Sequence, residues 1–559
     1  MDWLPKTAFC CLIGAGDAGK STILDAAEAA LSSRWFSFSE ADFLGCDTTK
    51  PIEIEATIGE LSKTLKSDER FGLYVRGWTK DGELRDEPED DDEPVLTVRL
   101  SVDATLEPVW ELVCDRAASG RVLSNRDRAL FGLVRLAGED ARHLSWGQGS
   151  VLSRLTGDTG EAAARLADAY RAARESANLG KIESLARAAS SAQRFAKGLG
   201  AYVADQYQPG LELGRSGLSS GSIALHDGSV PLRLAGLGTR RLATLAVQKS
   251  AITEGAIVLV DEIEHGLEPH RIMGAISQLK VDQTAAATAG APVGQVLLTT
   301  HSEVALGECG AGALHVVRTS RLEGNTSVLK TQAPIPIAAL LRFTPRALFA
   351  RRVVVCEGMT EVGLLLGVRE QWPPRNHGVP MEQMGVALAD GNGAEAPSLA
   401  LALAALGYAT ALFMDSDVPL SPAVDGALKA AGVAVFEYGS GLNTEQAMFT
   451  AASDQRVHEL LSLAKQNHTE NSVCDALMPK IPGATHQIVR QPFATWSRAV
   501  NIAPAQLKIT VAEVAKNKKW FKELRFGREV GLTVWGIMGE SREAALTNTL
   551  LRLEGWVYA

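Results

Sequence analysis

The feature that most constrains the fold is a glycine-rich turn near the start of the chain. Residues 14–21 read Gly-Ala-Gly-Asp-Ala-Gly-Lys-Ser, which fits the spacing G, four residues, G, K, S/T. The apolar residues 7–13 before it predict a strand, and the apolar spacing within 22–31 predicts a helix. A glycine turn between a strand and a helix N-terminus directs backbone N–H groups at phosphate oxygens. We therefore expect the chain to open with a phosphate-binding α/β unit.

An acidic strand end supplies the natural complement of this turn. We expect Lys20 to reach the β- and γ-phosphate oxygens of a nucleotide and Ser21 to bind Mg²⁺. The apolar strand 256–260 ends in Asp261, which would hold the Mg²⁺ shell, and Glu262, which would orient or deprotonate the attacking water. A chance glycine turn and an acidic helix cap are the alternatives. The residues expected to bind nucleotide are Gly14, Gly16, Gly19, Lys20, Ser21, Thr22 and Asp261.

Length and composition limit the class of protein. A chain of 559 residues is long enough for two to four domains, and 46 % hydrophobic with 22 % charged residues excludes disorder over most of its length. No apolar run reaches the roughly 18 residues of a membrane span, so we expect a cytoplasmic chain with no membrane partner. The 56 Lys and Arg against 66 Asp and Glu give a net charge of −10. A nucleic acid partner therefore requires a local basic patch or metal ions.

The first α/β unit is expected to be interrupted. Period-2 patterns predict antiparallel strands in a layer on this unit, at 51–58, 72–79 and 95–102. Residues 121–205 are rich in Ala, Arg, Leu and Glu at helical spacing, which predicts a helical insertion. Strand patterns return at 222–234, 256–261 and 295–300. We therefore place one domain in two parts, 1–120 and 206–345.

A second α/β series follows, and it gathers acidic residues at strand ends. Strand and helix patterns alternate within 346–440, which predicts a parallel sheet, and 441–559 is mainly helical. Glu357 ends the first strand and Glu361 opens the next helix, while Asp415 and Asp417 follow another strand.

Parallel strands bring their C-terminal ends to one edge of the sheet, so these four carboxylates should converge. We expect no Lys or Arg beside the converged carboxylates to neutralise them, so we expect a divalent metal, Mg²⁺ or Mn²⁺, with room for Ca²⁺ as a supporting second metal. Glu445 would complete a second metal position. Independent helix capping by each acid is the alternative.

The chain's most basic stretch is Lys516 to Arg528. It is either a solvated helix face or the place where the chain meets a phosphodiester.

The nucleotide motifs resemble those of ATP-binding-cassette (ABC) ATPases, specifically the SMC/RecF-like branch. Residues 264–270 look like that branch's D-loop, and His301 after an apolar strand looks like its switch histidine, which senses the γ-phosphate. A structural histidine at a strand end is the alternative reading of His301. Residues 234–242 stand where the family's signature motif should be, and they depart from its Ser-Gly-Gly form.

The acidic series resembles the TOPRIM domain of topoisomerases, primases and certain nucleases. An SMC/RecF-like ATPase followed by TOPRIM resembles the OLD (overcoming lysogenization defect) nucleases, which include the nuclease subunit of the Gabija phage-defence system. The resemblance implies two-metal DNA cleavage, with a late lysine at Lys522 or, failing that, Lys519. It also implies that 121–205 is the dimerisation region and that 441–559 completes the nuclease site. The implied catalytic set is Glu262, His301, Glu357, Asp415, Asp417 and Lys522; the implied metal ligands are Glu357, Glu361, Asp415, Asp417, Glu445, Ser21 and Asp261.

We therefore expect an α/β protein: a P-loop ABC-type ATPase domain with an antiparallel layer and a helical insertion, a TOPRIM parallel-sheet domain, and a helical C-terminal region. The expected function is ATP-regulated, metal-dependent DNA cleavage in phage defence or DNA processing. DNA and a homodimer or higher homo-oligomer are the expected partners, and the family leaves room for a helicase. The competing hypothesis is an ATP-dependent DNA-binding repair or chromosome-maintenance protein whose acids hold a structural metal and which does not cleave.

Overall fold

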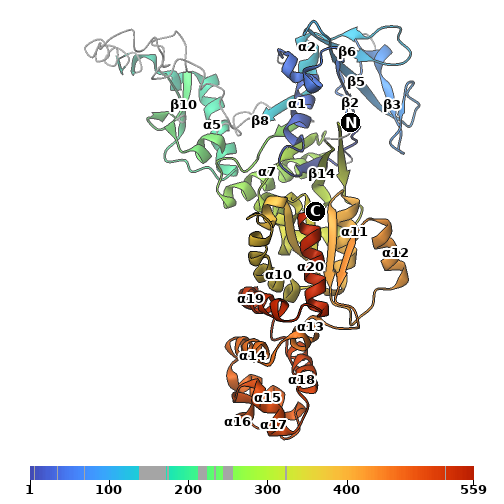
Figure 1. Ribbon diagram of the computed structural model, residues 1–559. Coiled ribbons are helices and arrows are strands. Elements are labelled where there is room, and N and C mark those ends of the chain that lie inside the picture. The colour runs from blue at the N-terminus through green and yellow to red at the C-terminus, as the bar shows by residue number, and fades with distance from the viewer. Residues whose placement is uncertain are drawn as a thin grey trace, which may run out of the picture. The chain divides into compact units, whose positions relative to one another are not determined.

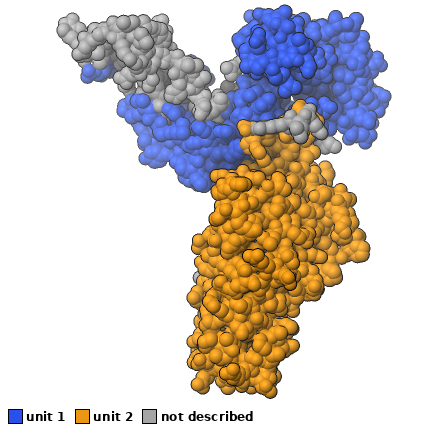
Figure 2. Space-filling view, in the orientation of Figure 1, with its two compact units in different colours: residues 1–12, 19–309 blue, residues 13–18, 310–559 orange. Residues whose placement is uncertain are grey.

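The computed structural model describes residues 1–5, 7–33, 35–67, 70–136, 171, 172, 175–211, 223–231, 234–242, 256–320, 324–522 and 524–559. Its contacts divide the chain into two compact units, which Figure 2 colours separately. One unit comprises residues 1–12 and 19–309, and the other comprises residues 13–18 and 310–559. Within the described ranges, no helix combines the length and apolar character needed to cross a bilayer.

The first unit is built on a parallel sheet whose strands come from distant parts of the chain. In order across the sheet, these strands are β1 (Phe9–Ile13), β13 (Gln295–Thr299), β12 (Ile257–Val260) and β8 (Leu133–Leu136). All five residues of β1 are buried, and helix α1 (Lys20–Leu31) begins directly after the glycine turn. The predicted strand, turn and helix are therefore confirmed.

The stretch from residue 121 to 136 differs from the predicted helical insertion. It forms a short strand β7 (Arg121–Val122), one helical turn α2 (Asn125–Arg128) and β8, which pairs with β12 over four residues. The prediction of helix was wrong here because two short apolar groups separated by arginine fit either period, and only the pairing with β12 selects a strand. Within the rest of the predicted insertion, α5 (Glu183–Gly198) is helical as expected. Residues 137–170 lie outside the described part.

An antiparallel layer completes the described core of the first unit. Strand β5 (Glu93–Val102) pairs with β2 (Ile52–Ile58), with β3 (Arg76–Trp78) and with β6 (Pro108–Val113), which we did not predict. The expected strand at 72–79 is shorter than predicted because Gly72–Tyr74 forms a 3-10 turn. A second antiparallel sheet, also in this unit, contains β9 (Tyr207–Leu211), β10 (Ile223–Asp227) and β11 (Val230–Pro231).

The second unit contains the predicted all-parallel sheet. Its strand order is β17 (Val386–Asp390), β16 (Arg352–Cys356), β18 (Ala409–Met414) and β19 (Ala434–Glu437). Helices follow the strands as expected: α10 (Met359–Val368) after β16, α11 (Ala396–Ala405) after β17 and α12 (Pro422–Ala430) after β18. The hairpin of β14 (Leu314–Ser320) and β15 (Asn325–Lys330), with helix α9 (Pro334–Phe343), precedes this series.

The chain after β19 is helical, as predicted. Figure 1 shows α14 to α18 gathered beyond the parallel sheet, with α19 and α20 returning toward it. Helix α13 lies against α18, and α20 contacts β19. The helices of this region are α13 (Thr444–Ala451), α14 (Asp454–His468), α15 (Glu470–Leu477), α16 (His486–Arg490), α17 (Trp496–Val500), α18 (Pro504–Asn517), α19 (Leu524–Glu540) and α20 (Ala545–Tyr558).

Helices α10 and α19 touch backbone to backbone through two glycines on each helix. Gly363 and Gly367 of α10 face Gly527 and Gly531 of α19. A Cβ atom on Gly531 would lie 2.3 Å from the carbonyl oxygen of Leu364, closer than any real Cβ contact. This contact fixes α10 against the C-terminal helices, and α10 carries Glu361 in its first turn.

Candidate functional site

The start of α1 and the end of β12 come together as the nucleotide motifs require. The Ser21 hydroxyl donates to Asp261 Oδ1 over 3.1 Å, and the Thr299 hydroxyl donates to the same oxygen over 2.6 Å. Lys20 is buried at the helix start, while Thr22 is exposed. Of the turn glycines, Gly19 has a left-handed φ of 84°, which glycine adopts without steric cost. The structure therefore groups Lys20, Ser21 and Asp261, while their role in nucleotide binding stays a prediction.

Two other turn glycines differ in how much room they leave. A Cβ on Gly14 would lie 2.5 Å from the carbonyl oxygen of Val317, whereas a Cβ on Gly16 would meet nothing within 4 Å. Gly14 is therefore required by a close backbone approach, and Gly16 lines open space.

Arg135 on β8 is a cation that the sequence analysis missed. Its guanidinium lies 3.1 Å from Asp261 Oδ2 and 2.8 Å from Glu28, and it also binds Asp25. Burial lowers the pKa of Arg135, but its hydrogen bonds to Asp25 and Glu28 raise that pKa overall. A fixed positive charge thus faces the oxygen of Asp261 that Ser21 does not occupy. The only sequence signal was one arginine inside a short apolar run.

Glu262 has an unusual backbone conformation that its neighbours hold in place. Its φ is 45°, in the left-handed region. Its N–H donates to Thr299 Oγ1 over 2.8 Å, and the buried Arg241 donates to its carbonyl oxygen over 2.6 Å and to that of Asp261 over 3.0 Å. Arg241 belongs to the segment that we aligned with the signature motif. In this chain, its guanidinium binds the backbone of Asp261 and Glu262.

Glu264 ties the D-loop-like segment to the end of β13. Its carboxylate accepts the backbone N–H of His301 over 2.5 Å and the Thr300 hydroxyl over 2.6 Å. His265 Nδ1 lies 3.9 Å from Glu262 Oε2. His301 therefore stands near the acidic pair through its backbone, and its assignment as a γ-phosphate sensor stays a prediction.

In the second unit, Glu357 and Asp415 meet at the ends of adjacent strands. β16 and β18 pair in parallel, and the backbone N–H of Asp415 donates to Glu357 Oε2 over 3.0 Å. Burial, the charge of Glu357 and hydrogen bonding with Asp417 raise the pKa of Asp415 to about 9. The predicted convergence of these three acids is therefore visible in both their contacts and their electrostatics.

Glu361 belongs to the same cluster from the first turn of α10. Its carboxylate accepts the N–H of Gly358 over 2.9 Å and the Thr444 hydroxyl over 2.7 Å. Burial raises its pKa to about 7; the Thr444 hydrogen bond opposes that rise, and the charges of Glu357 and Glu445 add to it. Glu361 thus caps its own helix and joins α10 to α13.

The lysine in direct contact with the cluster is Lys516, at the end of α18. Its ammonium group forms an ion pair with Asp417. Burial would raise the pKa of Asp417, but hydrogen bonds from Lys516 and Asp415 lower it. Lys522, the residue that we predicted, affects the cluster through its charge. Burial raises the pKa of Glu445, and the positive charges of Lys516 and Lys522 partly offset that rise. Lys519, the second choice, is exposed and has a left-handed φ of 55°.

The carboxylate oxygens of these acids are suitable ligands for a divalent cation, but the side chains are not already arranged around one metal position. Among the residues that the structure describes, no three His, Cys, Asp or Glu side chains are arranged closely enough to hold one metal ion. The carboxylates instead meet in pairs, Glu357 with Asp415 and Asp415 with Asp417. The raised pKa values of Asp415 and Glu361 mark uncompensated negative charge, which hard cations with oxygen ligands relieve.

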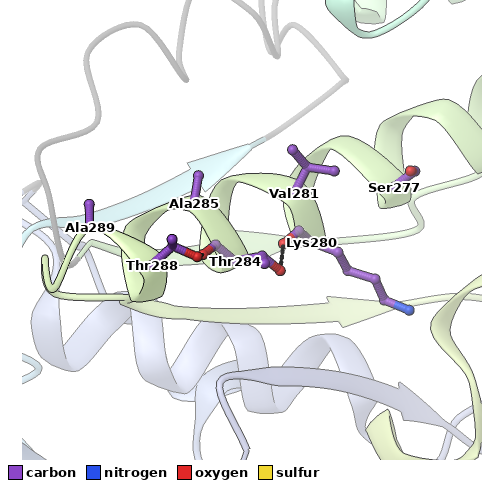
Figure 3. Close-up of a pocket in the computed structure, with 7 residues that line it drawn as sticks. All are labelled: Ser277, Lys280, Val281, Thr284, Ala285, Thr288 and Ala289. Carbon is purple, nitrogen blue, oxygen red and sulfur yellow. Dashed lines mark hydrogen bonds between the residues drawn. The ribbon is translucent and has the colours of Figure 1, made fainter.

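A groove along α7 (Pro269–Thr288) is unlike these two sites. It has a volume of about 590 Å³, and Figure 3 shows that its lining comes from this helix, including Val281 and Ala285, and from the C-cap residue Ala289. The Thr284 and Thr288 hydroxyls donate to carbonyl oxygens one turn earlier. The groove therefore presents few polar groups to a ligand, and we assign it no chemistry.

Comparisons with known proteins find a family match for one segment of each unit. Residues 168–307 match the family model described as "AAA domain, putative AbiEii toxin, Type IV TA system". Residues 348–417 match the model described as "Overcoming lysogenization defect protein-like, TOPRIM domain". No curated protein sequence matches the chain.

Solved structures give weak overall similarity. The SMC head domain from Thermotoga maritima aligns at 14% identity and a TM-score of 0.27, over 58% of this chain and 90% of that chain. The C-terminal region of the Xanthomonas campestris pv. campestris OLD protein aligns at 12% identity and a TM-score of 0.21, over 37% of this chain and 96% of that chain. The family models therefore carry the assignment. The chain joins an AAA-type ATPase domain to an OLD-like TOPRIM domain.

Proposed function

We propose that this protein is an ATP-regulated DNA endonuclease whose TOPRIM domain cuts DNA with divalent metal ions. The observation that carries the proposal is the pairing of Glu357, Asp415 and Asp417 at the ends of adjacent parallel strands, with Lys516 in contact. A purely structural role does not explain why three carboxylates stay together at one sheet edge, since their mutual repulsion destabilises the fold. A site that binds cations for reaction with a phosphodiester explains this grouping of carboxylates.

The chain's own side chains divide the work. Glu357, Asp415, Asp417, Glu361 and Glu445 would hold the metal ions, which supply an activated water and stabilise the leaving oxygen. Glu361 is the most fixed of these acids because Gly358 and Thr444 hold both of its oxygens.

Lys516 and Lys522 bring positive charge to a cluster that otherwise repels DNA. An ammonium group near Asp417 can neutralise charge that develops on the non-bridging phosphate oxygens. The two lysines are therefore the candidates for contact with the scissile phosphate, and the direct ion pair of Lys516 makes it the stronger one.

In the ATPase domain, Lys20 and Ser21 would bind the nucleotide phosphates and Mg²⁺, and Glu262 would position the water. The carboxylate of Asp261 is bonded to Ser21, Thr299 and Arg135 within its own unit. Hydrolysis and DNA cleavage should therefore respond to different substitutions. We further propose that the chain works as a homodimer or higher oligomer in phage defence or DNA processing.

Incubation of supercoiled plasmid with the full chain and Mn²⁺ tests the proposal. Nicked or linear product is expected from the wild type, and none from Asp415→Ala, whose ATP hydrolysis should stay near wild type. Asp425→Ala, which removes a half-buried acid paired with Lys429 on α12, is the matched control and should cleave normally. If the wild type binds DNA and hydrolyses ATP without cutting, the competing hypothesis of a DNA-binding repair or chromosome-maintenance ATPase is correct.

A further inference from the structure

Ser416, the residue between the two aspartates, is unusually well bonded. Its backbone N–H donates to the Leu442 carbonyl oxygen over 2.9 Å. Its hydroxyl lies 2.8 Å from the Gly439 carbonyl oxygen and 3.1 Å from that of Leu442, and it accepts the Leu442 N–H over 3.0 Å. A hydroxyl has one proton to donate, so the two carbonyl oxygens share it. Ser416 thus forms hydrogen bonds to both ends of one short turn, residues 439–442.

That turn has a backbone that needs external support. Gly439, Ser440 and Gly441 all have left-handed φ values, of 73°, 57° and 68°. Left-handed conformation is unfavourable for a serine, and it persists when surrounding bonds fix it. The bonds from Ser416 to Gly439 and Leu442 provide this fixation.

The turn leads directly into the other half of the carboxylate cluster. Asn443 caps α13, and its side chain and backbone exchange hydrogen bonds with Gln446. The next residues are Thr444, which donates to Glu361, and the buried Glu445. Through its bonds to Leu442, Ser416 therefore connects its chain neighbours Asp415 and Asp417 to the start of α13. Thr444, two residues after Leu442, bonds Glu361, and Glu445 follows directly.

The same turn forms part of the wall of a cleft next to the aspartates. The cleft has a volume of about 630 Å³, and Ser416, Gly439, Ser440 and Gly441 are among its lining residues. A loosened turn would therefore change both the spacing of the acids and the shape of the surface beside them.

We propose that Ser416 is a positioning residue that sets the distance between the two halves of the metal-binding cluster. The proposal rests on the proposed metal-dependent nuclease function. It predicts that Ser416 acts on metal binding and on the chemical step, and not on DNA affinity. The three side-chain hydrogen bonds of Ser416 are lost in Ser416→Ala, while Asp415 and Asp417 keep their own side chains.

The first measurement is the affinity for Mn²⁺, monitored by the electron paramagnetic resonance signal of the free ion. This measurement does not depend on DNA cleavage. We expect Ser416→Ala to weaken Mn²⁺ binding about tenfold and Ser416→Thr, which keeps the hydroxyl, to restore most of it. Ser421→Ala is the matched control, because the Ser421 hydroxyl caps α12 by accepting the Val424 N–H and, among the described residues, makes no hydrogen bond to the turn. It should lose similar stability and bind Mn²⁺ as the wild type does.

The second measurement is single-turnover plasmid cleavage with saturating enzyme. Ser416→Ala should cleave about 10²-fold more slowly, while DNA binding in Ca²⁺ stays within threefold. If Ser416→Ala binds Mn²⁺ and cleaves within twofold of wild type, the inference is overturned. If the wild type binds Mn²⁺ but does not cleave, the nuclease proposal fails while the Mn²⁺ affinities still decide the role of Ser416. A wild-type chain that neither binds Mn²⁺ nor cleaves overturns both.

Discussion

The contact between α10 and α19 should make Gly531 very hard to replace. In Gly531→Ala, the added Cβ would lie 2.3 Å from the Leu364 carbonyl oxygen and 2.7 Å from Gly367 Cα. Both partners are backbone atoms of another helix, so no side chain can rotate out of the way. The two helices would have to move apart by roughly 1 Å to restore ordinary contact distances.

The expected loss of stability follows from two opposing effects. Overpacking of a tight core costs about 1–3 kcal/mol and occasionally more, and a clash between two backbones belongs at or above the upper end. Alanine in place of a helical glycine recovers about 1 kcal/mol of helix propensity. We therefore expect the free energy of unfolding of the second unit to fall by about 2–3 kcal/mol. The corresponding drop in Tm is roughly 5–10 °C for a unit of this size.

Urea unfolding followed by tryptophan fluorescence, together with thermal circular dichroism, measures this loss. Gly555→Ala on α20 is the control, because a Cβ there would meet nothing within 4 Å. That variant should be as stable as the wild type or more stable by up to about 1 kcal/mol. If Gly531→Ala proves as stable as Gly555→Ala, the close approach of α10 and α19 is refuted.

Three further predictions concern single side chains. Glu262→Gln should keep ATP binding, measured with a fluorescent analogue, while hydrolysis falls about 10²-fold or more; unchanged hydrolysis would remove Glu262 from the reaction. Lys516→Ala should slow single-turnover cleavage more than Lys522→Ala does, because only Lys516 contacts Asp417, and the reverse order would restore Lys522 as the main lysine. Burial lowers the pKa of His315 on β14, so the unfolded chain protonates this histidine first as the pH falls, and the contribution of His315 to the free energy of unfolding should decrease from pH 7 to 5. Urea unfolding at both pH values should therefore show that His315→Gln gains stability relative to the wild type as the pH falls.

The sequence was most informative where local pattern and function agree. Alternating apolar runs and helical spacing predicted each strand of the parallel sheet between residues 352 and 437, because parallel strands buried on both faces leave long apolar runs. The order of acids at strand ends also predicted the grouping of Glu357, Asp415 and Asp417, because strand direction fixes the edge at which they emerge.

The sequence was least informative where a contact joins distant segments. Arg135 and Asp261 are 126 residues apart, and Lys516 and Asp417 are 99 apart. Helical position alone does not distinguish Lys516 from Lys522 within one basic stretch, since the choice depends on where the end of α18 meets the sheet. The strand β8 was missed for the same reason, because its conformation is selected by its partner β12.

The left-handed backbone of Glu262 stores conformational energy at the point where hydrolysis would occur. For a residue with a side chain, this conformation lowers the stability of the fold by about 1–2 kcal/mol, whereas a glycine adopts it without this penalty. Thr299 holds the Glu262 N–H and also bonds to Asp261. Because the Thr299 hydroxyl bonds to both residues, a change in what Asp261 binds would also change the hydrogen bond that holds the Glu262 backbone in its left-handed conformation.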